Sequence, residues 1–325
     1  MFDLVFICDA NNSIGFGHVN RCINLAKHLF KNNNKIKIGF LGSYVNEVKK
    51  RIRNNLNIKF IKKDDLVKSR CLVIDALGDD DDPNVFPTEK YKIAKYISEN
   101  IIYLCSGTKT SKFPKDVICI GFQPSGITSK PPNIYWGLKY APTLKIDYSY
   151  FKKRNKNKVL LALGGIKDIS IVKVILEVLE KSHTFKRIDI LWSPVNKNIF
   201  DEDIFKDSKI IKLHYDLKSI SPLLFESSIV IATFGFLSYE ALAHGAPLCS
   251  IATKKFQSDY GDLLEDRGLA YNVGLVNNNS KKKLSKLIKK TLDDADNLSI
   301  QAKKLMDGNG IKRLANIIEN YCKYE

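Results

Sequence analysis

The chain has 325 residues, which exceeds the usual size of a domain with one hydrophobic core and suits two domains of about 150 residues each. Hydrophobic residues make up 44% of it, enough for two packed cores. Lys and Arg number 52 against 35 Asp and Glu, a net charge of +17 that raises the question of nucleic-acid binding. Only 8 of the 52 are Arg, Lys is spread along the chain, and no zinc-finger or RNA-binding motif is present. A general Lys content is therefore the favoured interpretation, and we expect no nucleic-acid partner.

The lengths of the apolar runs and the spacing of the cysteines predict the cellular compartment of the protein. No run approaches the ~20 apolar residues that cross a bilayer, so we expect no membrane insertion. The first eight residues lack the basic segment of a signal peptide. Seven Cys form no C-x-x-C pair, which predicts reduced thiols rather than disulfides or a zinc site. We expect a cytoplasmic protein and a monomer.

The first part of the chain alternates short apolar strands with amphipathic helices, which is typical of a parallel α/β sheet. A strand over residues 4–8 leads through a loop to a helix whose apolar residues recur every three to four positions between Val19 and Phe30. Further strands are expected over 36–41, 71–75, 101–105 and 117–120.

A break in this pattern predicts the domain boundary. Residues 123–142 carry four Pro, and 152–158 are polar and basic, so the boundary is expected between about 140 and 157. The alternation then restarts, with strands at 159–163, 188–192, 209–213, 228–232 and 247–251 and helices at 171–179, 237–243 and 311–324. We predict two Rossmann-like α/β domains facing a cleft, 1–145 and 146–325, with the last helix able to pack back on the first domain.

The loop after the first strand carries Gly15, Gly17 and His18. The two glycines let the backbone approach a ligand, and the amides at the helix start face an anion. His18 is placed to act as a general base, and the positive end of the helix dipole keeps it neutral, as a base must be. The alternative is a surface His at a helix start.

A second strand–turn–helix segment contains Gly235, Ser238 and Glu240. Backbone amides from Gly235 to Ser238 are expected to hold a diphosphate, and Glu240 to accept both ribose hydroxyls. Ordinary complementarity of an acid to a helix start is the alternative for Glu240. His244 and Gly245 are expected to end this helix.

A third candidate segment follows the first strand of the second domain. Gly164 and Gly165 can approach a phosphate or the sugar closely. Asp168 is either part of this site or a cap of the next helix, and the sequence leaves both open.

These segments together resemble a known family. Residues 9–22 are similar to the D-x-S-x-x-I-G-x-G-H-x-x-R-C motif of the UDP-sugar hydrolase of the pseudaminic-acid pathway, a family that includes a spore-coat polysaccharide protein. Residues 164–168 resemble its G-G-x-D, 137–141 its G-x-x-Y-A, and 239–247 its nucleotide segment, with Gln257 after it. Wider relatives have the two-domain glycosyltransferase-B fold, as in the lipid II-forming N-acetylglucosaminyl transferase.

The resemblance implies a reaction and roles. His18 activates water, which releases UDP from C1 of a 2,4-diacetamido-2,4,6-trideoxy sugar with inversion, without a metal or cofactor. Glu240 binds the ribose. The implied substrate-binding set is Gly15, Gly17, Arg21, Gly164, Gly165, Asp168, Gly235, Ser238, Glu240 and Gln257.

The chain departs from the family at three places. The family's I-D-x-Y reads I-D-A-L over 74–77, its G-G-x-D gains Lys167, and its A-L-L-R reads P-T-L-K over 142–145. These differences touch the sugar side more than the nucleotide side. The alternatives are a glycosyltransferase of the same fold, in which His18 deprotonates an acceptor hydroxyl, and a non-catalytic sugar-nucleotide-binding relative.

Overall fold

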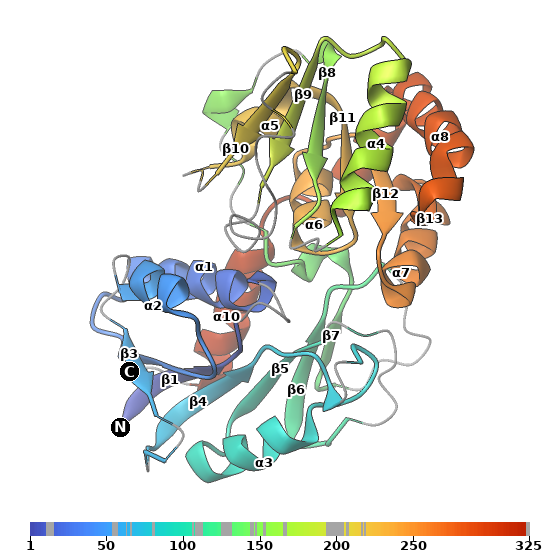
Figure 1. Cartoon of the computed structure of the whole chain (residues 1–325). Helices are drawn as coiled ribbons and strands as arrows, with labels where there is room; N and C mark the ends of the chain where they lie inside the picture. Colours follow the sequence, from blue (N-terminus) through green and yellow to red (C-terminus); the bar gives the residue numbers. More distant parts are fainter. Residues whose placement is uncertain are drawn as a thin grey trace. The chain divides into compact units, whose positions relative to one another are not determined.

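The chain divides into two compact units (Figure 1). In this computed structural model, unit 1 comprises Met1–Leu144 with Asn309–Glu325, and unit 2 comprises Lys145–Gly308. The structure describes residues 1–10, 16–53, 58–62, 64–65, 67–79, 82–105, 107, 113–124, 132–143, 146, 148–151, 154–164, 168–192, 205, 208–215, 217 and 219–322, without the side chains of 47, 51, 150 and 322.

Unit 1 is built on a parallel sheet with the strand order β3-β2-β1-β4-β5-β6-β7. The strands are β1 (Phe2–Ile7), β2 (Ile38–Leu41), β3 (Lys59–Ile61), β4 (Ser69–Ile74), β5 (Ile101–Cys105), β6 (Val117–Gly121) and β7 (Ile134–Trp136). The described helices are α1 (Gly17–Asn32), α2 (Asn46–Arg53), α3 (Thr88–Ile97) and α10 (Gly310–Cys322). The central strands are apolar and largely buried, as parallel strands covered on both faces require.

The last helix, α10, belongs to unit 1 although it ends the chain. It packs against α1, where Nδ2 of Asn32 donates to Oε1 of Glu319 at 3.2 Å. A Cβ on Gly310 would lie only 1.6 Å from the carbonyl oxygen of Ala141, so only glycine lets the two backbones approach here. The chain therefore leaves unit 1 between Leu144 and Lys145 and returns to it between Gly308 and Asn309.

Unit 2 repeats the same architecture with the strand order β10-β9-β8-β11-β12-β13, again parallel throughout. The strands are β8 (Asn155–Ala162), β9 (Arg187–Leu191), β10 (Ile211–His214), β11 (Ser227–Thr233), β12 (Leu248–Ala252) and β13 (Ala270–Leu275). The described helices are α4 (Ile169–Lys181), α5 (Ser221–Glu226), α6 (Phe236–Ala243), α7 (Lys255–Glu265), α8 (Lys281–Asp293) and α9 (Ala295–Leu305). The predicted α/β class with two Rossmann-like domains is confirmed.

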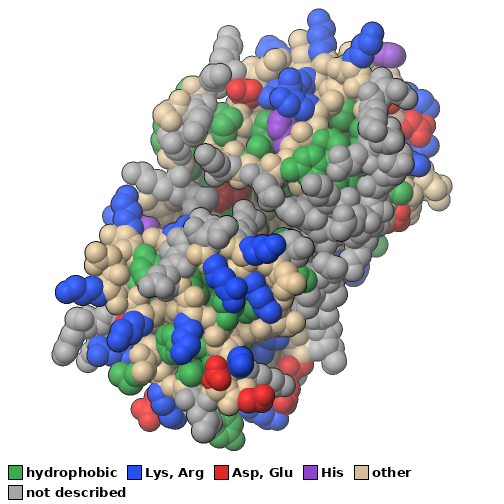
Figure 2. All heavy atoms as spheres, turned by 60° about the vertical axis from the view of Figure 1, so that its left-hand side comes forward, with side chains coloured by type: hydrophobic (Ala, Val, Ile, Leu, Met, Phe, Trp, Pro, Cys, Tyr) green, Lys and Arg blue, Asp and Glu red, His purple; other side chains and the backbone are tan. Residues whose placement is uncertain are grey.

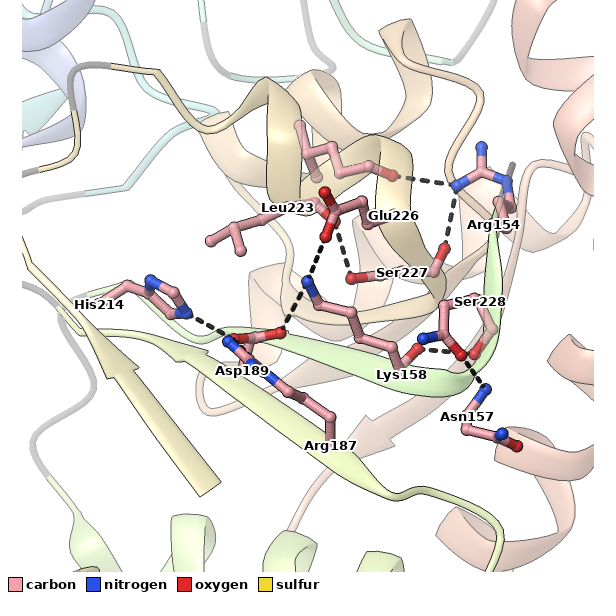
Figure 3. Close-up of polar contacts among 12 residues, drawn as sticks. Arg154, Asn157, Lys158, Arg187, Asp189, His214, Leu223, Glu226, Ser227 and Ser228 are labelled. Carbon is pink, nitrogen blue, oxygen red and sulfur yellow. Dashed lines mark hydrogen bonds and ion pairs between the residues drawn. The ribbon is translucent and has the colours of Figure 1, made fainter. Parts of the chain in front are cut away.

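The two faces of the unit 2 sheet differ in polarity. One face joins apolar side chains of the strands to those of α4 and α8 in a single core. Lys158 and Asp189 alternate with these core residues along β8 and β9, so they point to the opposite face. There Oδ1 of the fully buried Asp189 accepts from Nε2 of His214 at 2.5 Å and from Arg187 at 3.1 Å (Figure 3). Nζ of Lys158 lies 3.1 Å from Oδ2 of Asp189 and donates to Glu226 at 2.7 Å, which completes an ion network.

Several element ends differ from those the sequence predicted. β8 begins at Asn155 instead of residue 159, because the polar residues before the apolar run still pair with the strands on either side. β10 runs over Ile211–His214 instead of 209–213. β7, with three residues, lies inside the Pro-containing stretch and is too short to show a period.

The cysteines follow the prediction with one exception. Cys8, Cys22, Cys105, Cys119 and Cys249 are free and buried. Cys71 is disulfide-bonded, so the expectation of reduced thiols is wrong for this residue. The spacing of the cysteines along the chain does not reveal such a bond.

The charge of the surface and the length of the helices are relevant to the expected absence of nucleic-acid and membrane partners. Lys and Arg side chains occur over both units on the face that Figure 2 shows, with Asp and Glu among them. In the part of the chain that the structure describes, none of the helices combines the length and the apolar character needed to cross a bilayer.

Candidate functional site

The strand order of unit 1 changes direction between β1 and β4. From β1 the chain proceeds to β2 and β3 on one side, then returns to β4 and continues to β7 on the other side. In doubly wound sheets, ligands bind beyond the carboxyl ends of the strands at such a switch point. The helix α1 follows β1, and Asp75 directly follows β4, so both bring side chains to the unit 1 switch point.

Three polar side chains meet at the unit 1 switch point. Nδ1 of His18 lies 2.7 Å from Oδ1 of Asp75. Nε of Arg21 donates to Oδ2 of Asp75 at 2.8 Å, and Nη2 of Arg21 contacts Oδ1. The exposed fractions of His18, Arg21 and Asp75 are 8%, 6% and 0%. Their i, i+3 spacing puts the two α1 residues on one helix face, so both reach the same carboxylate.

The electrostatics of this cluster fix the tautomer of His18. Burial raises the pKa of Asp75, but the charge of Arg21 and the contact with His18 outweigh it and lower that pKa to about 2. An ionised carboxylate only accepts hydrogen bonds, so the 2.7 Å contact places the proton of His18 on Nδ1. In the neutral ring, Nε2 then carries the lone pair and is the atom through which His18 can take a proton.

Arg21 has a partner within the protein, whereas the sequence assigned it to substrate binding. Its guanidinium bonds Asp75 and lies over the ring of Phe122, 5.2 Å from the ring centre. Gly17 starts α1, and a Cβ placed on it meets no described atom within 4 Å. Gly15 lies outside the described residues.

Asp75 is a candidate residue that the sequence assignment did not include. The available signals were an acid at the end of an apolar run, which many solvated loops share, and its match to the D of the family's I-D-x-Y segment. Its pairing with His18 follows only from the adjacency of β4 and β1, where Phe2 pairs with Ser69 and Ile7 with Ile74.

Unit 2 has its own switch point, between β8 and β11. Gly164 follows β8 with a φ of +61°, a conformation that favours glycine. Oγ1 of Thr233, at the end of β11, donates to the carbonyl of Leu163 at 3.3 Å and ties the two strand ends together. A Cβ on Gly235 would come no closer than 4.0 Å to a described atom. Among the described residues, the two strand ends at the unit 2 switch point are thus formed by the small residues Gly164, Thr233 and Gly235.

The start of α6 supplies backbone amides at this switch point. The N–H of Ser238 donates to the carbonyl of Gly235 at 3.1 Å, and its hydroxyl donates to the carbonyl of Thr233 at 3.1 Å. The Ser238 amide, which the sequence assigned to a diphosphate, is thus used in forming the helix start. Helix geometry leaves the amides of Phe236 and Leu237 without an intrahelical acceptor, and these two suit an anion.

Glu240 and Gln257 lie near this turn in sequence or in space. Glu240 is in the second turn of α6 and is 2% exposed. Oε1 of Gln257 accepts from the N–H of Thr253 at 2.9 Å, and its Nε2 donates to the carbonyl of Phe234 at 3.4 Å. Gln257 therefore links the start of α7 to the turn that precedes α6.

Two further candidates have structural partners. Asp168 accepts from the N–H of Ser170 at 2.8 Å and so caps α4, one of the two roles left open by the sequence. His244 ends α6 as predicted. Its Nδ1 donates to the carbonyl of Glu240, and its Nε2 accepts from the hydroxyl of Ser221, each at 2.8 Å. Burial lowers the pKa of His244, which keeps it neutral. Gly165 lies outside the described residues.

Comparisons with known sequences place the chain only loosely. No protein-family model matches it. An uncharacterised protein of Methanocaldococcus jannaschii is 25% identical over 295 residues, which cover 81% of this chain and 58% of that protein. The chain thus spans less than two thirds of the length of this relative.

Comparisons with solved structures identify the fold. The calicheamicin glycosyltransferase CalG4 matches with a TM-score of 0.68 at 10% identity, over 99% of this chain and 98% of that one. MurG of Acinetobacter baumannii gives 0.57 at 11% over 98% and 99%. The spinosyn rhamnosyltransferase SpnG complexed with thymidine diphosphate gives 0.58 at 11% over 97% and 100%. The chain has the fold of the GT-B glycosyltransferases.

Proposed function

We propose that this chain is a nucleotide-sugar hydrolase that releases UDP from C1 of a UDP-linked 2,4-diacetamido-2,4,6-trideoxy sugar, in the formation of a pseudaminic-type acid. The observation that carries the proposal is the His18–Asp75 pair at the unit 1 switch point. The resemblance of residues 9–22 to the hydrolase motif supports water as the nucleophile.

The geometry of the pair suits general-base catalysis. Nε2 of His18 takes a proton from water as the water oxygen bonds to C1 and the bond from C1 to the diphosphate oxygen breaks. The bonding electrons leave with UDP, and attack from the opposite side inverts C1. Asp75 accepts from Nδ1, which holds the ring and stabilises the imidazolium that forms. A base of this kind is worth about 10²–10⁴-fold in rate.

The nucleotide side of the proposal rests on unit 2. Gly164 and Gly235 leave the backbone open at the switch point, and the first amides of α6 suit the diphosphate. Binding of thymidine diphosphate by SpnG, which shares the fold, supports a nucleoside diphosphate as the ligand class. Glu240 is the residue we assign to the ribose.

Glycosyl transfer is the second candidate. The observation that favours it is that this chain shares its fold with CalG4 and SpnG, which are named as a glycosyltransferase and a rhamnosyltransferase. In this reaction His18 takes the proton of an acceptor hydroxyl, and the same two bonds at C1 form and break.

The test is UDP release from UDP-sugars in H₂¹⁸O with excess chelator, with and without a candidate acceptor. We expect release without acceptor and ¹⁸O in the sugar, because water attacks C1. Label in the phosphate means cleavage of a P–O bond and contradicts the mechanism. Release only with acceptor supports the transferase. A raised melting temperature with UDP-sugar but no turnover supports a non-catalytic binding protein.

A further inference from the structure

The carboxylate of Asp75 serves more than His18. Oδ1 contacts both Nδ1 of His18 and Nη2 of Arg21, while Oδ2 accepts from Nε of Arg21 at 2.8 Å and from Sγ of Cys22 at 3.5 Å. Asp75 has no exposed surface, so these groups replace water around it. A buried carboxylate that is this fully bonded is held in one position.

Arg21 also lies against His18 itself. Its Nη2 is 2.9 Å from Nδ1. Both nitrogens carry hydrogens when Nδ1 donates to Asp75, so this contact is no hydrogen bond. It sets a guanidinium, which stays charged at any working pH, directly against the imidazole.

The other titratable side chains near the cluster are thiols and phenols. Cys22 lies on α1 and contacts Cys8, whose Sγ is 3.6 Å from the hydroxyl of Tyr44. Tyr103 lies on β5, the strand that pairs with β4. Burial raises the pKa of Cys22, Tyr44 and Tyr103. Asp75 and Arg21 are therefore the charged groups in contact with His18 among the described residues.

We propose that Arg21 is a positioning residue that holds Asp75 against His18 and offsets its charge, so that His18 remains an unprotonated base at lower pH than a lone His–Asp pair allows. The proposal rests on the role of His18 as the base. In a lone pair, the whole charge of the carboxylate favours the imidazolium. Here the fixed charge of Arg21 opposes that effect, while Asp75 still fixes the tautomer.

The two charges act on His18 in opposite directions. Without the charge of Arg21, the negative charge of Asp75 favours the imidazolium unopposed. His18 then takes up its proton at higher pH, and the acid limb of the pH–rate profile moves to higher pH. Without the charge of Asp75, Arg21 acts unopposed and the limb moves down. A charge at this distance typically shifts a titration by about 1–3 pH units.

The first measurement needs no substrate. Proton NMR follows the His18 ring through a pH titration, with the resonance assigned by its loss in His18→Asn. We expect the midpoint to rise by about 1–3 pH units in Arg21→Gln and to fall in Asp75→Asn. It should stay near the wild-type value in Arg21→Lys, which keeps the charge, and in the control Arg70→Gln. Arg70 is a β4 arginine whose Nε lies 3.7 Å from Asp3.

An unmoved midpoint in Arg21→Gln overturns the proposal. If Arg21→Gln does not fold, Asp75→Asn decides. A His18 midpoint that rises or stays unchanged in Asp75→Asn also overturns the proposal. The second measurement is the pH profile of kcat for UDP release, where the acid limb should move as the midpoint does, with KM little changed. A raised KM with an unmoved midpoint means that Arg21 binds substrate. Shifted midpoints without any turnover leave the charge arrangement standing and refute the proposed function.

Discussion

The two switch points have the same topology and opposite chemistry. In unit 1, the point between β1 and β4 gathers His18, Arg21 and Asp75, all nearly or fully buried. In unit 2, the point between β8 and β11 is lined by Gly164 and Gly235, with backbone amides at the start of α6. Strand order therefore fixes where ligands meet a doubly wound sheet, and the residues after each strand decide the chemistry.

The proposed function assigns a different task to each switch point. Proton transfer needs a titratable group whose tautomer is fixed by a partner, and the His18–Asp75 pair is the one we propose for it in unit 1. Holding an anion needs close approach to backbone N–H groups, which side chains would obstruct. In unit 2, no described atom lies closer than 3.9 Å to a Cβ placed on Gly164 or Gly235. Unit 2 also has a buried ion network around Asp189.

Removing the base tests the unit 1 side and should give the largest effect. His18→Asn keeps a polar side chain that can donate to Asp75 but lacks a basic nitrogen, so kcat for UDP release should fall by about 10²–10⁴-fold while KM is retained. Steady-state kinetics in excess chelator measure this. His28→Asn, on the same helix, is the control and should retain its activity. Near-normal turnover in His18→Asn places the base elsewhere or removes this chemistry from the chain.

The ion network of unit 2 should affect stability and not chemistry. Asp189→Ala removes one of the two carboxylates that bind the buried Lys158. Breaking a buried pair costs up to about 3–5 kcal/mol of unfolding free energy, and the remaining bond to Glu226 should keep the loss below that limit. Urea unfolding measures the loss. UDP binding by the folded fraction should be unchanged, and a specific loss of binding would contradict a purely structural role.

The same variant should change how stability depends on pH. Burial raises the pKa of Asp189, but the bonds from His214 and Arg187 and the charge of Lys158 lower it overall. A carboxyl whose pKa is lower in the folded state stabilises the fold above its unfolded value, about 3.9, and loses that contribution as pH falls. The difference between wild type and Asp189→Ala should therefore shrink below about pH 4. Glu89→Ala, at an exposed pair with Lys92, should change stability little and serves as the control.

On the nucleotide side, Glu240→Ala should weaken UDP binding by about 1.5–3 kcal/mol, or roughly 10- to 150-fold, through loss of charge-assisted hydrogen bonds to the ribose. Isothermal titration calorimetry measures the affinity. Glu180→Ala, at an exposed position of α4, serves as the control. Unchanged UDP affinity in Glu240→Ala would contradict the assignment of Glu240 to the ribose.

The fold could be predicted because its central strands are nearly continuous apolar runs and α1 carries a clear helical stripe. The order of the strands could not, since parallel pairing depends on crossovers and not on neighbouring residues. This is why Asp75 was missed, although its position at a strand end was visible. The apolar residues of α8 also follow a helical period, but they stand among lysines and were overlooked.

The candidate site divides in the same way. His18 and Gly235 were predicted because a glycine turn between strand and helix suggests a mechanism, and their roles stay predictions. Arg21 and Ser238 were assigned to a ligand, and the structure adds partners within the protein, Asp75 and Thr233, so their contact with a ligand stays a prediction. A sequence displays which polar groups are present, but only the fold determines which of them the protein itself uses.

The smallest expected change sharpens the comparison at Gly235. A Cβ there would come no closer than 4.0 Å to a described atom, and the residue is extended, so Gly235→Ala should alter the unfolding free energy by less than about 0.5 kcal/mol. The added methyl group should still weaken UDP binding by about 1 kcal/mol, roughly fivefold, because it stands where the diphosphate approaches the backbone. Gly245→Ala makes a matched control: φ is +61° and the Cβ would lie 2.6 Å from Cε of Lys303, so here stability should fall. Paired urea unfolding and calorimetry separate the two. If Gly235→Ala binds UDP as tightly as wild type, the diphosphate does not lie against this turn, and the openness of the unit 2 switch point needs another explanation.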